Sequence, residues 1–135
     1  MVFDTSAFLT LTGDEPGADQ VQAHVTEAIA GRVQLNASFV SLTEVEYITL
    51  QEEGEEAARQ RLAEVRFLPI QWHHSDDELC SAAANLKAAH RVSFADSFVA
   101  ALAQRLDATL VHKDPEFNAL AGVVKLEMLP PKEAE

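Results

Sequence analysis

Residues 93–117 read S-F-A-D-S-F-V-A-A-L-A-Q-R-L-D-A-T-L-V-H-K-D-P-E-F, and they decide the fold. In the first half of this stretch, Phe94, Phe98 and Leu102 recur at helical spacing. The pattern predicts a helix that lays an apolar face on a flat surface and carries Asp96 in its first turn.

The second half predicts a short strand followed by a helix start. Residues 108–111 are strand formers, Asp114 can cap a helix, and Pro115 suits the first helical position. In an α/β domain, the carboxyl ends of parallel strands and the helix starts that follow them share one edge of the sheet, where such folds bind ligands. We therefore expect Asp96 and Asp114 to approach each other at that edge.

The rest of the chain alternates predicted strands and helices. Strands are expected at residues 1–3, 33–37, 67–72 and 123–128, and Pro69 indicates that the third is irregular or lies at a sheet edge. Helices are expected at residues 7–11, from Pro16 to the residue before Gly31, from Ser41 to about Leu50, and at residues 57–65 and 76–90. Because no hairpin signal separates the strands, the pattern predicts an α/β fold whose parallel sheet is covered by helices on both faces.

Length and charge limit the classes of function. With 135 residues the chain fits one compact domain, which we expect at residues 1–129, followed by a short, frayed acidic tail at residues 130–135. Acidic residues outnumber Lys and Arg by 22 to 10, which gives a net charge of -12. This balance excludes a generally basic surface for nucleic acid, so such a substrate would need bound cations or a local basic patch.

The cellular setting follows from what the sequence contains. Cys80 is the single cysteine, so no internal disulfide can form and a reducing compartment is expected. The N-terminus has no signal-peptide pattern, and no apolar run is long enough to cross a bilayer. The sequence therefore predicts a soluble, cytoplasmic protein with no membrane contact.

Four acids occupy equivalent positions in the predicted fold. Asp4 and Asp114 each end an apolar strand, whereas Glu44 and Asp96 each follow a serine by three residues, as in a helix capping box. Each acid taken alone can be explained by helix capping. Together at one sheet edge, four carboxylates would repel one another by several kcal/mol at an effective dielectric of about 20. Protonation or bound cations would relieve this repulsion, and carboxylate ligands suit Mg²⁺ or Mn²⁺.

The same residues resemble a known family. The segments V-F-D-T-S-A-F-L, S-L-T-E-V-E-Y, F-A-D-S-F-V-A-A-L-A and T-L-V-H-K-D-P-E-F, which span almost the whole chain, are similar to the PIN-domain ribonucleases and most closely to the VapC-type toxins. The resemblance implies a three-layer α/β/α sandwich with a central parallel sheet and a Mg²⁺ or Mn²⁺ site. It also implies endonucleolytic cleavage of RNA, inhibition by a cognate antitoxin protein, and a homodimer.

The family pattern also implies a role for each acid. Asp4, Asp96 and Asp114 match the acids that hold the principal metal ion, and Glu44 matches the acid that orients a water or shares a second ion. Thr5 and Ser6 match the hydroxyl positions beside the first aspartate, where they would position a carboxylate or the scissile phosphate. One departure is His112, since the family more often has Thr or Ser two residues before the last acid.

Other residues near these acids allow competing interpretations. Glu46 cannot face the same site as Glu44, because two positions on a helix are about 200° apart, so we expect Glu46 to be solvated. The neighbours His73 and His74 would point to opposite faces of a strand and make a poor chelating pair. His112 could contact substrate or water at the site.

Basic and aromatic side chains could contact an RNA. Lys87, Arg91 and Lys113 are the basic residues nearest the acids in sequence, and they could hold phosphates, although such side chains are usually only solvated. Trp72 and Tyr47 could stack on bases, or they could pack in the core or at a dimer contact.

Functions from other classes fit the sequence less well. A response-regulator receiver has adjacent acids after the first strand, and a haloacid-dehalogenase-like phosphatase has a second aspartate two residues after the first, where this chain has Ser6. A catalytically silent interaction module and a stand-alone processing nuclease remain as alternatives. The first is disfavoured because all four acids are present.

Overall fold

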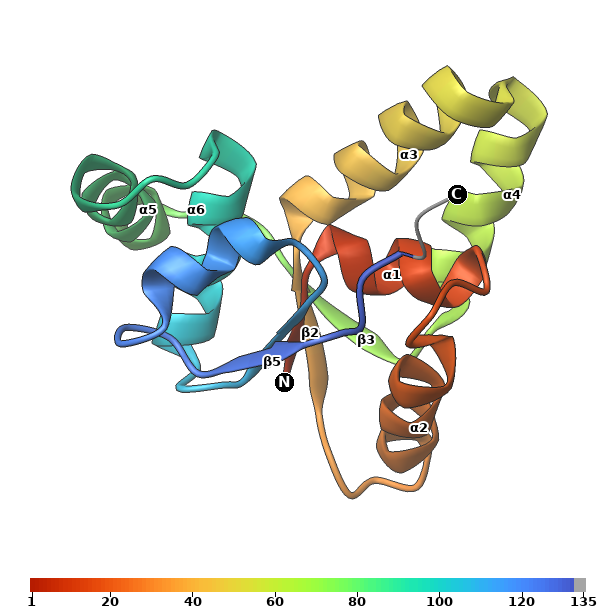
Figure 1. Cartoon of the computed structure of the whole chain (residues 1–135), viewed down its shortest axis with the longest axis horizontal. Coiled ribbons are helices and arrows are strands. Elements are labelled where there is room, and N and C mark those ends of the chain that lie inside the picture. The colour runs from red at the N-terminus through yellow and green to blue at the C-terminus, as the bar shows by residue number, and fades with distance from the viewer. Residues whose placement is uncertain (133–135) are drawn as a thin grey trace.

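The computed structural model describes residues 1–132 and contains one five-stranded parallel sheet (Figure 1). The strand order is β3-β2-β1-β4-β5. The strands are β1 (Val2–Phe3), β2 (Leu35–Ser38), β3 (Ile70–His73), β4 (Leu110–His112) and β5 (Leu126–Met128). Every pair of neighbours is parallel, which confirms the predicted sheet.

Helices cover both faces of this sheet and make a three-layer α/β/α sandwich, as predicted. The helices are α1 (Thr5–Thr12), α2 (Ala18–Ile29), α3 (Phe39–Glu53), α4 (Glu55–Phe67), α5 (Asp77–Ala89), α6 (Phe94–Arg105) and the 3-10 helix η1 (Pro115–Leu120). Residues of α5, α6 and η1 share one apolar core, and residues of α1 to α4 share the other. Figure 1 shows these two groups of helices on opposite sides of the strands.

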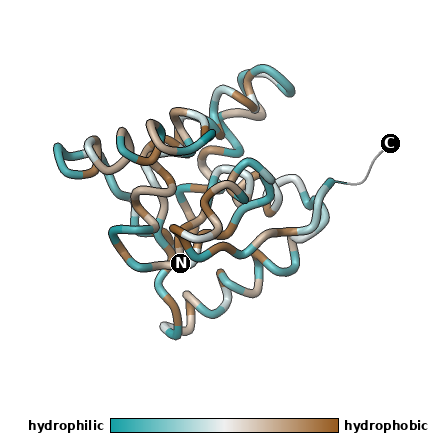
Figure 2. Tube along the Cα trace, turned by 60° about the vertical axis from the view of Figure 1, so that its left-hand side comes forward, coloured by the Kyte–Doolittle hydropathy of each residue, from teal (hydrophilic) through white to brown (hydrophobic). Residues whose placement is uncertain are grey.

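The two cores follow from the alternation of side chains along the strands. Val2 and Leu110 point into the core beneath α6, and their neighbours Phe3 and Val111 point into the core beneath α1. All four side chains are fully buried. The tube in Figure 2 accordingly shows hydrophobic residues in the middle of the molecule and hydrophilic residues on the outer turns of the helices.

The central strand β1 is only two residues long, and its position defines the site. Val2 pairs with Asn36 of β2 on one side and with Leu110 of β4 on the other. The main-chain N–H of Asp4 still donates to the carbonyl of Val111, with N and O 3.0 Å apart. Asp4 is therefore fixed at the carboxyl end of the sheet, between two neighbouring strands.

Several predicted boundaries need correction. The helix α3 begins at Phe39, because Ser38 caps it by accepting from the N–H of Val40, so the capping box predicted at Ser41 is wrong. The third strand is shorter than predicted and lies at the sheet edge, in agreement with the signal from Pro69. The helix α6 packs its predicted apolar face in the core, but it is buried on its other faces as well. Every residue from Asp96 to Ala103 is buried because the sheet and α5 pack around this helix.

The residues at the ends of α6 also depart from the predicted pattern. Phe94, predicted on the buried face, is 69% exposed. Arg105, in the last turn of the helix, pairs with Asp76 through two hydrogen bonds of 2.7 and 2.9 Å. The buried part of the helix thus ends before its last turn.

Residues 130–132 run past the loop between α1 and α2. The ring of Pro130 approaches Gly17, whose positive φ of 99° suits a residue without a side chain. Nζ of Lys132 lies 3.5 Å from a carboxylate oxygen of Glu15. The remainder of the predicted frayed tail, residues 133–135, lies outside the described residues. Within residues 1–132, no helix combines the length and the apolar character needed to cross a membrane.

Candidate active site

Asp4 provides the first acid of the site. It follows β1 and caps α1, and its Oδ2 accepts from the N–H of Ser6 at 3.1 Å and from the Ser6 hydroxyl at 2.5 Å. The side chain is buried, and its other oxygen, Oδ1, has no hydrogen-bond partner among the described residues. One carboxylate oxygen is thus held in place and the other is left free to bind a ligand.

Ser6 connects this acid to the neighbouring strand. The main-chain N–H of Lys113 donates to the Ser6 hydroxyl oxygen at 2.9 Å, and that hydroxyl in turn donates to Asp4. The side chain of Lys113 turns away and reaches Glu15 Oε1 at 3.2 Å and the carbonyl of Pro16 at 2.9 Å. Lys113 therefore anchors the loop before α2, and its ammonium is already occupied by partners within the protein.

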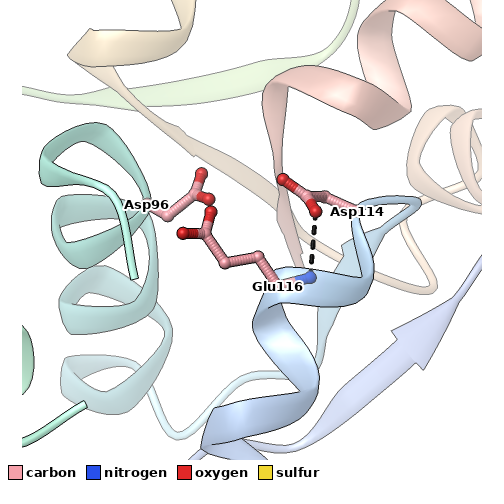
Figure 3. Close-up of side chains that lie close together, drawn as sticks. All are labelled: Asp96, Asp114 and Glu116. Carbon is pink, nitrogen blue, oxygen red and sulfur yellow. Dashed lines mark hydrogen bonds between the residues drawn. The ribbon is translucent and has the colours of Figure 1, made fainter. Parts of the chain in front are cut away.

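Asp96 enters the site from the first turn of α6. Ser93 caps this helix as predicted, since its hydroxyl oxygen accepts from the N–H of Asp96 at 3.1 Å. The buried carboxylate of Asp96 turns towards the end of β4 (Figure 3). Capping by Ser93 thus leaves the Asp96 side chain available for the site.

Asp114 and Glu116 reach the same place from η1. Asp114 caps this helix by accepting from the N–H of Glu116 at 2.9 Å, and Pro115 occupies its start as predicted. Carboxylate oxygens of Asp96, Asp114 and Glu116 all lie within 4.8 Å of one another, and Figure 3 shows the side chains of Asp96 and Glu116 meeting. The structure thus unites two acids that were predicted for the site with one that was not.

Glu116 is the acid that the sequence analysis missed. The signal was available in the segment D-P-E, because a cap at Asp114 followed by proline places Glu116 in the first turn, beside its cap. An acid there is normally explained by the helix dipole alone, which is why it did not stand out.

Burial, and to a smaller extent the crowding of carboxylates, raises the pKa values of two acids at the site. The pKa of Asp96 rises to about 9, first because burial disfavours the charged form, and then because of Glu116 and the negative charges of Asp4 and Asp114. The pKa of Asp4 rises to about 6 through burial, against the opposing effect of its hydrogen bonds from Ser6, and the charge of Glu44 raises it further. The repulsion expected from the sequence is therefore present at this edge of the sheet.

Glu44 lies on the Asp4 side of the site, outside the group formed by Asp96, Asp114 and Glu116. Its Oε1 accepts from the Thr5 hydroxyl at 2.7 Å, and the same hydroxyl lies 3.0 Å from that of Ser41. Since α3 begins at Phe39, Glu44 stands in the second turn rather than the first. Thr5, rather than a helix cap, positions this acid.

His112 lies beneath Asp114 and is fully buried. Its Nδ1 is 2.9 Å from the main-chain carbonyl of Asp114, and its ring packs against Phe117 with 5.2 Å between ring centroids. Burial lowers the pKa of the imidazole, so the ring is neutral and the proton on Nδ1 donates to that carbonyl. Nε2 is buried without a partner among the described residues. His112 thus contacts the main chain of Asp114 instead of pointing at a substrate.

Among the other basic and histidine candidates, some side chains are bonded within the protein and others are exposed. Nζ of Lys87 donates to the carbonyl of Val92 at 2.9 Å, whereas Arg91 is exposed and forms no ion pair within residues 1–132. His73 lies 2.9 Å from Oδ1 of Asn36, and His74 is exposed, which is consistent with their not forming a chelating pair. Arg91 is therefore the basic candidate whose side chain remains free for a phosphate.

The two aromatic candidates for base stacking differ in their exposure to solvent. Trp72 packs in the core, stacked on Phe8 with 5.4 Å between ring centroids. Tyr47 is 43% exposed on α3.

The acids fit a divalent cation. The site brings three carboxylates within reach of one another, and a fourth, Asp4, has a buried oxygen without a partner among the described residues. The pKa of Asp96 is also strongly raised. These observations indicate that the negative charge of the site needs a positive charge to balance it. The donors are all oxygen atoms, which Mg²⁺ and Mn²⁺ prefer to softer ligands. The residues present thus match the chemistry of such an ion.

Solved structures with the same fold include toxin and antitoxin proteins. One is VapBC2 from Rickettsia felis bound to a DNA fragment from the promoter, with a TM-score of 0.75, 17% identity, and 96% and 100% of the two chains covered. Another is VapC20 from Mycobacterium tuberculosis, a sarcin-ricin loop cleaving toxin, with a TM-score of 0.73, 18% identity and the same coverage. A third is DNA-bound VapBC from Salmonella typhimurium, with a TM-score of 0.69, 18% identity, and 94% and 96% of the two chains covered.

Comparison at the level of sequence gives two results. None of the curated protein sequences compared with the chain matches it. The model of the PIN domain matches residues 1–123, which is most of the chain. On this match, together with the parallel sheet and the acids at its carboxyl edge, the chain belongs to the PIN domain family.

Proposed function

We propose that this protein is a divalent-metal-dependent endoribonuclease that hydrolyses RNA phosphodiester bonds, and that it is the VapC-type toxin of a toxin-antitoxin pair. The observation that carries the proposal is the convergence of Asp96, Asp114 and Glu116 beside the buried, half-free carboxylate of Asp4. Membership of the PIN domain family supports the same chemistry.

The acids would divide the work at this site. Asp4, Asp96, Asp114 and Glu116 would hold Mg²⁺ or Mn²⁺, which supplies Lewis-acid stabilisation of charge on the phosphate. Glu44, held by Thr5 outside this group, would orient the water that attacks phosphorus in line with the departing oxygen. Ser6 would keep the free oxygen of Asp4 directed at the ion by occupying the other one.

We further propose that the protein works in the cytoplasm with a cognate antitoxin and as a homodimer. The support for the antitoxin is the likeness to structures of VapBC complexes, two of which hold DNA. At 17 to 18% identity this likeness establishes a common fold, so the partner needs its own test. A short neighbouring gene for a DNA-binding protein would favour a toxin over a stand-alone processing nuclease.

The proposal is tested by RNA cleavage with three samples: the protein with Mn²⁺, the protein with EDTA, and the Asp96→Asn variant with Mn²⁺. We expect cleavage only in the first. Asp14→Asn is a matched control, because it removes the same charge at an exposed position outside the group of acids. Cleavage that persists unchanged in the Asp96→Asn protein would show that a different site, or a contaminant, is responsible.

A further inference from the structure

We propose that a hollow between α3 and the start of α6 binds an unpaired RNA base next to the scissile bond. The hollow has a volume of about 500 Å³, and its walls include Phe39, Tyr47, Phe94 and Glu44. This inference rests on the proposed nuclease function and adds a specific contact to it.

The hollow adjoins the acidic site through Glu44 and Ser93. Glu44 lines it and also accepts the hydroxyl of Thr5, the residue directly after Asp4. Ser93 lines it as well, and its hydroxyl caps the N–H of Asp96. An RNA strand whose phosphate lies at the acids must place an adjoining nucleotide over a neighbouring surface, and the walls of this hollow include Glu44 and the cap of Asp96.

Two exposed aromatic rings border the hollow from different helices. Phe94 is 69% exposed and Tyr47 is 43% exposed, and they extend from α6 and α3 respectively. The Phe94 ring is held edge-to-face by Phe98, with 5.3 Å between centroids, and Phe98 makes a similar contact with Phe39 at 5.6 Å. The Phe94 ring is therefore supported from one side and open on the other, as a stacking surface for a base requires.

The residues that line the hollow suit an uncharged base better than the negatively charged backbone of the RNA. No basic residue is among those that line it, and Glu44 is the one charged residue there. With a net charge of -12, the protein has no generally basic surface for RNA, so uncharged stacking would add to what bound cations and Arg91 supply. A volume of about 500 Å³ is also on the scale of small-molecule pockets, which suits one planar ring better than a helix or strand of another protein.

The test measures RNA binding separately from cleavage. In an Asp96→Asn background with Mn²⁺, a short single-stranded RNA of mixed sequence is titrated against the parent, Phe94→Ala, Tyr47→Ala and Phe67→Ala proteins. Phe67 is the matched control, since it is 92% exposed at the end of α4, before the amino end of β3. We expect Phe94→Ala to weaken binding about 5- to 150-fold, the range that base stacking gives on alanine substitution, and Phe67→Ala to leave it unchanged.

A second measurement reports stacking directly. The fluorescence of a Phe94→Trp variant should be quenched by the single-stranded RNA and much less by the same sequence in a duplex, whose bases are already stacked. Unchanged affinity in Phe94→Ala, or no RNA binding by the Asp96→Asn protein, overturns the base site. Self-association of the Phe94→Ala protein is measured by sedimentation without RNA. If self-association is lost while the affinity for RNA is unchanged, the hollow binds a second copy of the chain, and this result also overturns the base site.

The two proposals can fail separately. If the protein cleaves RNA with Mn²⁺ and Phe94→Ala has the same KM and kcat, the nuclease stands and the base site is rejected. If Phe94-dependent binding is observed but no cleavage occurs with Mn²⁺, the nuclease is rejected and the base site stands.

Discussion

Nδ1 of His112 donates to the main-chain carbonyl of Asp114, two residues further along the chain, at 2.9 Å. The imidazole is fully buried and its Nε2 has no partner among the described residues, so the protein bears the cost of an unsatisfied polar atom to keep this contact. The contact fixes the main chain at the point where Asp114 both caps η1 and presents its carboxylate.

Substitutions at His112 can separate this contact from simple packing. An asparagine places its amide N–H where Nδ1 was, whereas a glutamine places its amide where Nε2 was. We expect His112→Gln and His112→Leu to weaken Mn²⁺ binding about 10- to 100-fold, the usual effect of removing a group that orients a metal ligand, and His112→Asn to retain most of the affinity. Calorimetric titration with Mn²⁺ measures this, and equal affinities for the asparagine and glutamine variants would contradict it.

Removing the Asp96 carboxylate should stabilise the metal-free protein at neutral and alkaline pH. The folded-state pKa of Asp96 is raised from 3.8 to about 9, so the folded protein retains a proton that the unfolded chain releases. Stability is therefore greatest below 3.8 and falls as the pH rises towards 9. With EDTA near neutral pH we expect a Tm several degrees higher for Asp96→Asn, since about 1 kcal/mol moves the Tm of a domain of this size by roughly 3–6 °C.

The gain should shrink in acid, where the native aspartate is protonated in both states. Asp14→Asn controls for the general loss of negative charge, because Asp14 is exposed and its φ of 49° is one that asparagine tolerates. A pH-independent difference between the Asp96→Asn and parent Tm values would show that the raised pKa is not its source.

Glu116 should matter for metal binding as much as the acids that the sequence pattern suggested. Its carboxylate lies within 4.8 Å of those of Asp96 and Asp114, so Glu116→Gln removes a negative ligand and should reduce Mn²⁺ affinity by at least about tenfold. Glu46→Gln is the control, because Glu46 lies on α3 beside Glu44 in sequence but outside this group. In thermal unfolding, Mn²⁺ should raise the Tm of the parent and Glu46→Gln proteins more than that of Glu116→Gln, and equal shifts in all three would exclude Glu116 as a ligand.

Asp76 should contribute to stability down to low pH. Its hydrogen bonds from Arg105, together with the N–H of Leu79, lower the pKa of its carboxyl group from 3.8 to about 2. A depressed pKa stabilises the folded state above 3.8, and the contribution is lost as the pH falls towards 2. Asp76→Asn should lower the Tm slightly near neutral pH, and the difference should disappear at about pH 2. A difference that is constant with pH would show that the charge of Asp76 is not its source.

The order of elements and the edge where the acids meet could be predicted from the sequence because both depend on local signals. Asp4, Asp96 and Asp114 each stand at a strand end or helix start, and parallel pairing brings such positions to one edge. The start of α3 could not be chosen, because Ser38 and Ser41 are equally good caps. The structure uses Ser38 as the cap and places Ser41 beside the hydroxyl of Thr5.

The environment of α6 could not be predicted for a different reason. Helical spacing shows which residues share a face, but it does not show how many faces have neighbours. Here every face of the helix between Asp96 and Ala103 is covered, while Phe94 at its start is exposed. Glu116 was hidden because capping by Asp114 already explained an acid at that position.

The shortness of β1 has a consequence for when the site can exist during protein synthesis. Asp4 is placed by β1, whose two residues are held by pairing with β2 and β4 and by packing in the two apolar cores. Asp114 and Glu116 follow β4 and are synthesised after Asp4 and Asp96. A chain still being translated therefore carries isolated acids and no assembled cluster. If the protein cleaves RNA, it becomes able to do so only after η1 has been synthesised and β4 has joined the sheet.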